Sequence, residues 1–155
     1  MSKRIRVCEI VFSLDIEAEG GGITRFVSAL SQALDSRDFE PVVCGLWDRG
    51  TQVEKELSQR LAQAGIQTFT CARWDDNHPY RAFYEAYKKL RAWIKNQPVD
   101  IVHSHSEFGD VAAMLLKLEG KAPIIVRTLH NGLPMEWRRR LRWRNRSGRR
   151  SPHAI

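Results

Sequence analysis

Short apolar runs rich in β-branched residues alternate along the chain with stretches whose apolar residues recur at helical spacing. The runs predict strands at residues 5–12, 41–47, 66–71, 100–103 and 123–128. The stretches between them predict helices over residues 23–34, 51–65, 79–94 and 107–118. This alternation is typical of a parallel sheet whose strands are connected by crossover helices.

Several helix ends carry recognisable signals. Thr51 and Glu54 have the spacing of a capping box, and Gly65 suits the left-handed residue that often ends a helix. Both ends of the second helix are therefore well marked. Pro79 fits the first turn of the third helix, and Ser106 is the expected N-cap of the fourth.

Two helices carry apolar stripes that we expect to face the sheet. In the first helix the stripe consists of Ile23, Phe26, Val27, Leu30 and Leu34. In the third helix it consists of Tyr80, Phe83, Tyr84, Tyr87, Leu90 and Ile94. Residues at this spacing are more often core than ligand contacts, so we assign both stripes to the core.

These elements predict an α/β fold, a Rossmann-like parallel sheet of about five strands with helices on both faces. Right-handed crossovers favour the strand order 3-2-1-4-5. In that order the winding reverses between strands one and four, so the loops that leave these strands flank one crevice at the carboxyl edge of the sheet. Those loops contain the glycine run at residues 20–22 and the segment 103–106.

The net charge of +7 is confined to the end of the chain. Residues 1–134 contain 17 Lys or Arg and 17 Asp or Glu, whereas residues 135–155 contain 8 Arg and one Glu. We therefore expect a charge-balanced domain, 1–134, and an irregular Arg-rich tail, 135–155, that is disordered or partly helical. A basic surface for nucleic acid is not favoured. The tail could contact an anionic membrane surface through Arg138, Arg139, Arg140, Arg142 and Arg144.

Cysteine usage and hydropathy indicate the cellular compartment. Cys8, Cys44 and Cys71 are far apart and each lies in an apolar run, so we expect reduced core thiols. No stretch reaches the length of about 18 apolar residues that a transmembrane helix needs. The first apolar run is short and is broken by Glu9, which argues against a signal peptide. We expect a cytoplasmic protein that could lie at the inner face of the membrane.

The three glycines at residues 20–22 precede a predicted helix N-terminus, where backbone amides and the helix dipole favour a phosphate or another anion. The spacing does not complete GxGxxG, because Arg25 occupies the last position. A tight turn between strand and helix explains the glycines equally well. A non-catalytic Rossmann-like module for a nucleotide stays an alternative, with Asp48 near the position of a ribose-binding acid.

Histidines gather at the same edge of the predicted sheet. His103 and His105 point to one side of an extended chain, where they could serve a ligand, hydrogen-bond within the core or share a metal ion. Further ligands at predictable places are not evident, so we expect no metal. His130 and Asn131 follow the fifth strand and could hydrogen-bond a polar ligand, although Asn131 and Gly132 also suit a plain turn.

In order and spacing, several motifs together resemble the N-terminal domain of GT4-type glycosyltransferases, which are retaining two-domain enzymes of the GT-B fold. The motifs are the strand at residues 5–12, GGITRFV at 21–27, GI at 65–66, PVDIVHSHS at 98–106 and PIIVRTLHN at 123–131. The resemblance runs from about residue 4 to residue 133 and depends on the whole set of motifs.

The resemblance implies a nucleotide sugar as co-substrate, a glycan or lipid-linked acceptor, and no cofactor or metal. In this family the C-terminal domain holds most of the donor, while the N-terminal domain recognises the acceptor and closes over the donor. Gly21 and Gly22 would then bind the donor diphosphate through their amides. His105 first, and His103 second, would lie beside the transferred sugar as catalytic residues. The residues expected to line the cleft are Ser106, His130 and Asn131.

The second domain of the family does not follow within these 155 residues. With it are missing the donor-base pocket, the basic residues that grip the diphosphate and the paired-glutamate motif of the C-terminal half. We therefore expect a truncated gene product or a split half whose last residues do not continue the family sequence. On this hypothesis the isolated chain has little or no activity, and a C-terminal domain would have to act in trans.

Overall fold

The computed structural model describes residues 3–75 and 77–130, and it confirms the predicted α/β fold. The strands are β1 (Ile5–Ser13), β2 (Phe39–Asp48), β3 (Gln67–Arg73), β4 (Ile101–Ser104) and β5 (Ile124–Arg127). The helices are α1 (Gly21–Ala33), α2 (Gln52–Gln63), α3 (Pro79–Asn96) and α4 (Glu107–Leu118). Each predicted element is present, and its bounds differ from the prediction by at most two residues.

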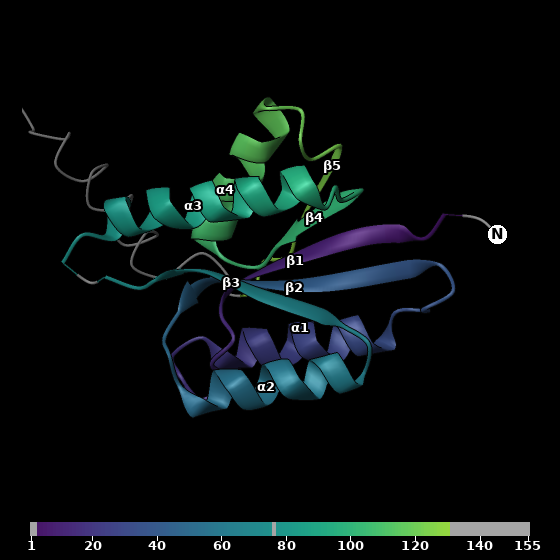
Figure 1. Ribbon diagram of the computed structural model, residues 1–155, viewed down its shortest axis with the longest axis horizontal. Helices are drawn as coiled ribbons and strands as arrows, with labels where there is room; N and C mark the ends of the chain where they lie inside the picture. Colours follow the sequence, from purple (N-terminus) through teal and green to yellow (C-terminus); the bar gives the residue numbers. More distant parts are fainter. Residues whose placement is uncertain (1–2, 76, 131–155) are drawn as a thin grey trace, which may run out of the picture.

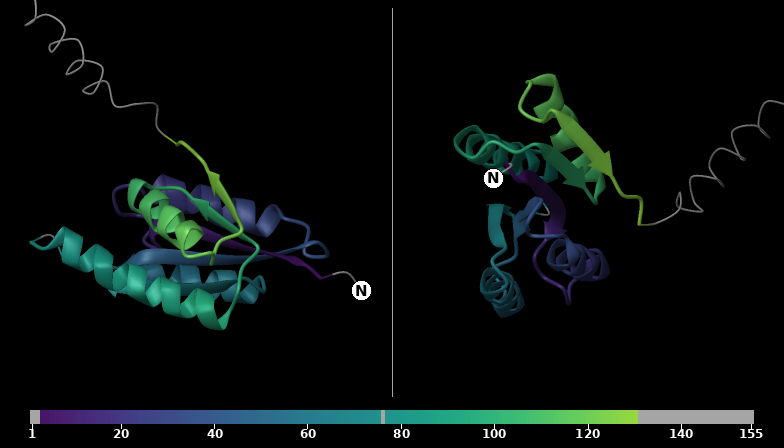
Figure 2. Two further views of the ribbon diagram at one scale, coloured as in Figure 1. Left: turned by 90° about the horizontal axis from the view of Figure 1, so that it is seen from above. Right: turned by 90° about the vertical axis from the view of Figure 1, so that its right-hand side faces the viewer.

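The strands form one parallel sheet in the predicted order, β3-β2-β1-β4-β5. Figure 1 shows α1 and α2 on one face of this sheet and α3 and α4 on the other. β1 lies in the middle of the sheet and β5 at one edge (Figure 2). The winding therefore reverses between β1 and β4, and the carboxyl ends of these neighbouring strands mark the switch point at which such folds bind ligands.

Alternating strand residues send apolar side chains to both faces of the sheet. The core under α3 and α4 includes Ile10, Leu46, Leu90 and Leu116. The core under α1 and α2 includes Val11, Val43, Leu57 and Leu61. Burial on both faces is what a parallel sheet requires, and each fully buried aliphatic side chain stabilises the fold by about 2 kcal/mol.

One residue of β1 interrupts this apolar pattern. Glu9 is 1% exposed and lies between Val7 and Val11, which share its side of the strand. In the sheet it stands opposite His103 of β4. Burial of a carboxylate is costly unless the charge is paired, so the partners of Glu9 define a polar site inside an apolar layer.

The predicted helix caps are confirmed. Thr51 and Glu54 form a reciprocal capping box at the start of α2, and Gly65 follows that helix with a φ of 75°. α3 begins at its predicted proline. The hydroxyl of Ser106 accepts a hydrogen bond from the amide of Gly109 at 3.2 Å, which fixes the start of α4 beside the end of β4.

The apolar stripes of α1 and α3 are narrower than predicted. Tyr80 and Tyr84, expected on the inner side of α3, are 86% and 59% exposed. The buried side of α3 consists instead of Ala82, Ala86, Tyr87, Leu90 and Ile94. Its two alanines let the helix lie close to the sheet, so side chains that flank this stripe stay outside the contact. In α1, Val27 is the one fully buried member of the predicted stripe, and Phe26 is 47% exposed, with its ring against those of His105 and His130. The other buried residues of α1 are small: Gly21, Thr24, Ser28 and Ser31.

The cysteines and the helix lengths were also predicted from the sequence. The three cysteines, Cys8, Cys44 and Cys71, are free and buried, as predicted for core thiols. Burial raises the pKa of the Cys8 and Cys44 thiols, so they stay protonated at neutral pH. Among the described residues, none of the helices is long and apolar enough to cross a membrane.

Candidate functional site

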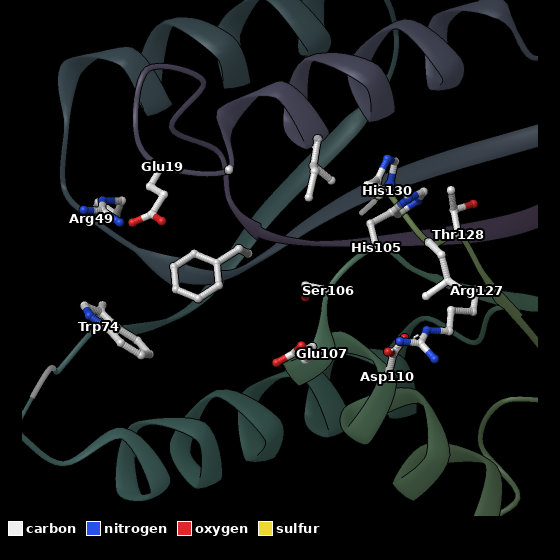
Figure 3. Close-up of a pocket in the computed structure, with 14 residues that line it drawn as sticks. Glu19, Arg49, Trp74, His105, Ser106, Glu107, Asp110, Arg127, Thr128 and His130 are labelled. Atoms are coloured by element: carbon white, nitrogen blue, oxygen red, sulfur yellow. Dashed lines mark hydrogen bonds and ion pairs between the residues drawn. The ribbon is translucent and has the colours of Figure 1, made fainter. Parts of the chain in front are cut away.

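A pocket of about 620 Å³ opens at the carboxyl ends of the strands, beside the switch point between β1 and β4. Its walls come from the ends of β1 and β5, from the start of α4 and from the loops that precede α1, α2 and α3. Toward one end of the pocket Figure 3 shows Glu19, Arg49 and Trp74, and toward the other His105, His130 and Arg127. The pocket therefore lies where the predicted crevice should be.

Behind the pocket wall, two histidines share one oxygen of the buried Glu9. His105 Nε2 lies 2.7 Å from Glu9 Oε2, and His103 Nδ1 lies 3.0 Å from the same atom. An ionised carboxylate only accepts hydrogen bonds, so both ring nitrogens carry the hydrogens and donate them. The parallel register creates this arrangement, because Glu9 stands opposite His103 and His105 follows two residues later on the same side.

The two rings stabilise the ionised form of Glu9. Burial by itself raises the pKa of Glu9, but the hydrogen bonds and charges of His103 and His105 outweigh it, and the pKa of Glu9 lies below its usual value. Glu9 is therefore ionised at neutral pH. An ionised carboxylate at this depth is tolerated only because polar partners surround it.

His130 continues the network to the pocket surface. Its Nε2 lies 2.9 Å from Nδ1 of His105, and the Phe26 ring packs edge-on with its centroid 5.1 Å from that of His130. Burial and the charges of His105 and His103 lower the pKa of His130, so His130 is neutral at pH 7. Glu9, His105 and His130 thus form a hydrogen-bonded chain from the sheet interior to the pocket wall.

His103 occupies the other side of Glu9, with its ring centroid 4.1 Å from that of His105. Its second nitrogen, Nε2, lies 2.8 Å from Oγ1 of Thr128, and its side chain is 12% exposed. Glu9, His103 and His105 each offer one donor atom, and these three atoms lie within 4.8 Å of one another. The group is therefore compact enough to hold a metal ion in place of the hydrogens that the two rings donate to Glu9.

Cationic side chains stand at both ends of the pocket. Nε of Arg127 lies 2.8 Å from Oδ2 of Asp110, and the other oxygen of Asp110 accepts a hydrogen bond from the Ser104 hydroxyl. Asp110 thereby ties α4 to the ends of β4 and β5. The Arg127 side chain is still 53% exposed, so its guanidinium group is open to an anionic ligand. Arg49 lines the opposite end together with Glu19.

The three glycines at the start of α1 differ in conformation and surroundings. Gly20 has a left-handed φ of 80° and lines the pocket. A Cβ on Gly21 would lie 2.2 Å from the carbonyl oxygen of Ile16, so only glycine fits there. The Gly21 amide donates to the carbonyl of Ala18 at 2.9 Å. One of the two amides predicted to bind a diphosphate is therefore already hydrogen-bonded within the loop. Gly22 is exposed, and a Cβ there would meet nothing within 4 Å.

An aromatic wall, formed by Phe12 and Trp74, closes another side of the pocket. The two rings have centroids 5.3 Å apart, and Trp74 also packs against Trp47 and Phe108 at 4.9 and 6.3 Å. These contacts hold the indole ring of Trp74 in place. Large aromatic faces next to a few polar groups are typical of small-molecule sites.

The structure brings some of the predicted residues together at the pocket, whereas Gly21 and Gly22 are not among the described residues that line it. His105, Ser106 and His130 line the pocket, and His103 lies behind them. Their roles toward a ligand stay predictions. Asp48, proposed for a ribose, accepts a hydrogen bond from the Gly50 amide at 2.8 Å and holds the turn after β2.

Two groups of predicted residues lie outside the described part of the chain. They are Asn131, expected in the cleft, and the five tail arginines Arg138, Arg139, Arg140, Arg142 and Arg144.

Sequence reasoning missed the centre of the site, which is Glu9. The signal was present, because a single carboxylate stood in an otherwise apolar β-branched run. Buried parallel strands are nearly continuous apolar segments, so a charge within one predicts a partner from a neighbouring strand. Arg49 and Asp110 carried no comparable signal, since charged residues are ordinary in a loop and in the first turn of a helix.

Known proteins match this chain in sequence profile and in fold. The profile of Glycosyltransferase Family 4 matches residues 20–155. This range includes the Arg-rich tail, contrary to the expectation that the last residues depart from the family sequence. No curated protein matches the chain significantly in sequence.

Two solved structures illustrate the fold. UGT2 of Phytolacca americana, complexed with UDP-2fluoro-glucose and pterostilbene, superposes with a TM-score of 0.61 and 15% identity, over 100% of this chain and 38% of its own. A glycosyltransferase from Rickettsia africae ESF-5 has a TM-score of 0.58 and 18% identity, over 90% of this chain and 34% of its own. The chain therefore spans little more than a third of the structures it resembles.

Proposed function

Because this chain belongs to glycosyltransferase family 4, we propose that it forms the N-terminal domain of a retaining glycosyltransferase of the GT-B fold. In the proposed reaction a hexosyl group passes from a nucleotide sugar to a glycan or lipid-linked acceptor. The domain recognises the acceptor and contacts the donor diphosphate. The proposed reaction uses a nucleotide sugar as co-substrate and no further cofactor.

The observation that carries this proposal is the position of the pocket. It opens at the carboxyl ends of β1 and β4, where the winding of the sheet reverses, and it is large enough for a sugar phosphate or a sugar with part of its acceptor. The UGT2 structure, which holds a UDP-sugar and an acceptor, supports nucleotide-sugar and acceptor binding by this fold.

The donor diphosphate would lie between the N-terminus of α1 and the cationic side chains of the pocket. The Gly22 amide stands in the first turn of α1, where the helix dipole favours an anion. Arg127 can add a charge-assisted hydrogen bond with the part of its guanidinium group that Asp110 leaves open. Such groups act most strongly on the charge that develops on the leaving diphosphate.

His105 is the proposed neighbour of the transferred sugar. Both of its ring nitrogens have partners, Glu9 on one side and His130 on the other, so the imidazole cannot rotate freely. A fixed His105 ring holds His130 in place at the pocket wall, so little entropy is lost there when the sugar binds. His105 therefore contributes by positioning, with His103 as its support on the far side of Glu9.

The acceptor would pack against the aromatic wall, Phe12 and Trp74. Sugar rings and lipid chains both present apolar C–H surfaces, which pack well against large aromatic faces. The acidic side chains Glu19 and Glu107 also line the pocket and could accept hydrogen bonds from acceptor hydroxyls. This combination fits a neutral glycan or a lipid-linked sugar better than an anionic acceptor.

The isolated 155-residue chain is proposed to have little or no transferase activity, because the family binds most of the donor with its C-terminal domain. Turnover of a UDP- or GDP-sugar by the purified chain would contradict this part of the proposal. A C-terminal domain supplied in trans is expected to restore transfer.

Ligand titration separates this function from a plain nucleotide-binding module. We expect saturable quenching of tryptophan fluorescence by a UDP- or GDP-sugar, since Trp74 lines the pocket, and no saturable change with NADH. Arg127→Gln should weaken binding of the nucleotide sugar, whereas Arg37→Gln, which alters an exposed ion pair with Asp35, should not. Saturation with NADH alone, or no saturation with any nucleotide sugar, would overturn the proposal.

A further inference from the structure

We propose that Glu9, His103 and His105 form a binding site for one zinc-type divalent transition metal ion. The proposed metal site shares His105 with the proposed sugar site, but the transfer reaction does not require the metal. The metal-site proposal does not depend on the proposed function, because its test measures metal binding alone.

The three side chains offer atoms that suit a zinc ion. Two imidazole nitrogens and one carboxylate oxygen are ligands that zinc prefers, and three protein ligands with one open position are typical of accessible zinc sites. In this structure the donors are His103 Nδ1, His105 Nε2 and Glu9 Oε2, all within 4.8 Å of one another. Glu9 and His103 come from the adjacent strands β1 and β4, and His105 directly follows β4, with its amide bonded to the carbonyl of Ile10 at 3.1 Å.

The outer partners of the histidines are the second argument. A metal-bound imidazole usually donates its other N–H to a fixed acceptor, which orients the ring. Nε2 of His103 faces the hydroxyl oxygen of Thr128 at 2.8 Å, and Nδ1 of His105 faces Nε2 of His130 at 2.9 Å. Each outer nitrogen therefore has a polar neighbour that can accept a hydrogen once the ion is bound, the Thr128 hydroxyl after rotation and His130 Nε2 in its other tautomer.

The buried carboxylate of Glu9 also favours a cation at this position. The Glu9 carboxylate is 1% exposed and lies in a layer of apolar side chains. Without a metal, the groups of the described residues closest to it are the ring N–H groups of His103 and His105. A divalent cation would balance the same charge more strongly, because attraction between opposite charges increases in a buried environment.

The ligand atoms must separate slightly to accept the ion. Zinc bonds to nitrogen and oxygen of about 2.1 Å in a tetrahedron place neighbouring ligand atoms about 3.4 Å apart. The present separations from Glu9 Oε2 are 2.7 Å for His105 and 3.0 Å for His103, so the His105 ring would have to move outward further than the His103 ring. Each ring nitrogen that faces Glu9 would release its proton to solvent, and a ring without a hydrogen on its outer nitrogen would take one up there from solvent, so that each bound ring is neutral.

Calorimetric titration of the purified chain with Zn²⁺ tests the proposal directly, with Co²⁺ as a spectroscopic probe of coordination. We expect one ion per chain with a Kd of about micromolar or tighter, and a Co²⁺ spectrum of four-coordinate nitrogen and oxygen ligation. Glu9→Gln keeps the side-chain shape but removes the charged ligand, and it should weaken binding by at least about tenfold. His103→Gln provides a second test if Glu9→Gln does not fold.

Two matched controls locate the ion. His78 lies in the loop before α3, with its Nδ1 3.2 Å from Asp75, and His153 belongs to the tail. His78→Gln and His153→Gln should leave the affinity of the strong site unchanged. Absence of a saturable 1:1 site overturns the proposal, as does full affinity in both Glu9→Gln and His103→Gln or loss of the site in either control.

Discussion

The carboxylate of Glu9 and the imidazole of His105 meet at 2.7 Å although they stand 96 residues apart in the sequence. Both side chains are almost completely buried; Glu9 belongs to β1 and His105 directly follows β4, at the switch point beside the pocket. His105 in turn contacts His130 at the pocket wall. This relationship links the interior of the sheet to the proposed sugar site, and it makes the ring orientation of His105 a property of the fold.

Removal of the Glu9 carboxylate should destabilise the protein. Glu9→Ala leaves two buried imidazoles without their acceptor and opens a cavity between Val7 and Val11, so we expect a loss of about 2 to 4 kcal/mol in the free energy of unfolding. Urea denaturation measures this loss. Glu40→Ala removes a carboxylate that is 40% exposed and pairs with Arg4 and Arg6, and it should change stability by less than about 1 kcal/mol. Equal effects of the two substitutions would contradict the assigned role of Glu9.

Alanine substitutions at the two adjacent glycines that begin α1 should have opposite effects on stability. Gly21→Ala places a methyl group 2.2 Å from the Ile16 carbonyl oxygen, which the loop must move to avoid, and we expect a loss of about 2 kcal/mol or more. Gly22→Ala meets open space in a helical first turn and should be neutral or stabilise by up to about 1 kcal/mol. Thermal unfolding of the two variants decides the matter, and a stable Gly21→Ala protein with its α1 intact would contradict the packing described here.

The junction between α3 and α4 should show a defined acid dependence. Hydrogen bonds from Lys121, Arg91 and Tyr87 lower the pKa of Glu119 to about 2. Because the pKa is lower in the folded state, the stabilising contribution is present above the ordinary carboxyl pKa of about 4.3 and is lost as the pH falls toward 2. Glu119→Gln should therefore lower the melting temperature at pH 7, and this difference should shrink on acidification from about pH 4 to pH 2. A difference that does not change with pH would show that the charge of Glu119 is not responsible.

The core thiols should be inert toward thiol reagents while the protein is folded. Cys8 and Cys44 are completely buried and Cys71 is 2% exposed, and burial raises the pKa of the Cys8 and Cys44 thiols. The reactive thiolate is therefore scarce and inaccessible. Labelling with an aromatic disulfide reagent should be limited by unfolding in buffer and fast in denaturant. Rapid labelling of the native chain would contradict the packing around these residues.

Most of the fold could be predicted from local patterns. Apolar runs and helical stripes set the five strands and four helices, and the handedness of crossovers then selected the strand order. Ser106 and Thr51 gave correct caps because a capping hydrogen bond is a local interaction. Tyr80 and Tyr84 were misplaced because periodicity shows which residues can share a face, but not how wide the contact with the sheet is.

The candidate site could be predicted only in outline. His105 and the glycine run were found because they end strands or begin helices at the carboxyl edge. The partnership of Glu9 with His103 and His105 depends on the register between β1 and β4, which no local pattern gives. The same holds for the pairing of Arg127 with Asp110, since the two residues meet only after β5 is placed beside β4.

The most direct test of the account is a map of nucleotide-sugar binding on the isotope-labelled chain by NMR. We predict that a UDP- or GDP-sugar shifts the amide signals of Gly22, Ile23 and Ser106 together with the imidazole signals of His105. Signals of residues 35–38, which lie at the amino ends of the strands and away from the pocket, should not move. Shifts confined to these residues, or no shifts at the pocket while the fold is intact, would contradict the assignment of the pocket as the sugar-transfer site.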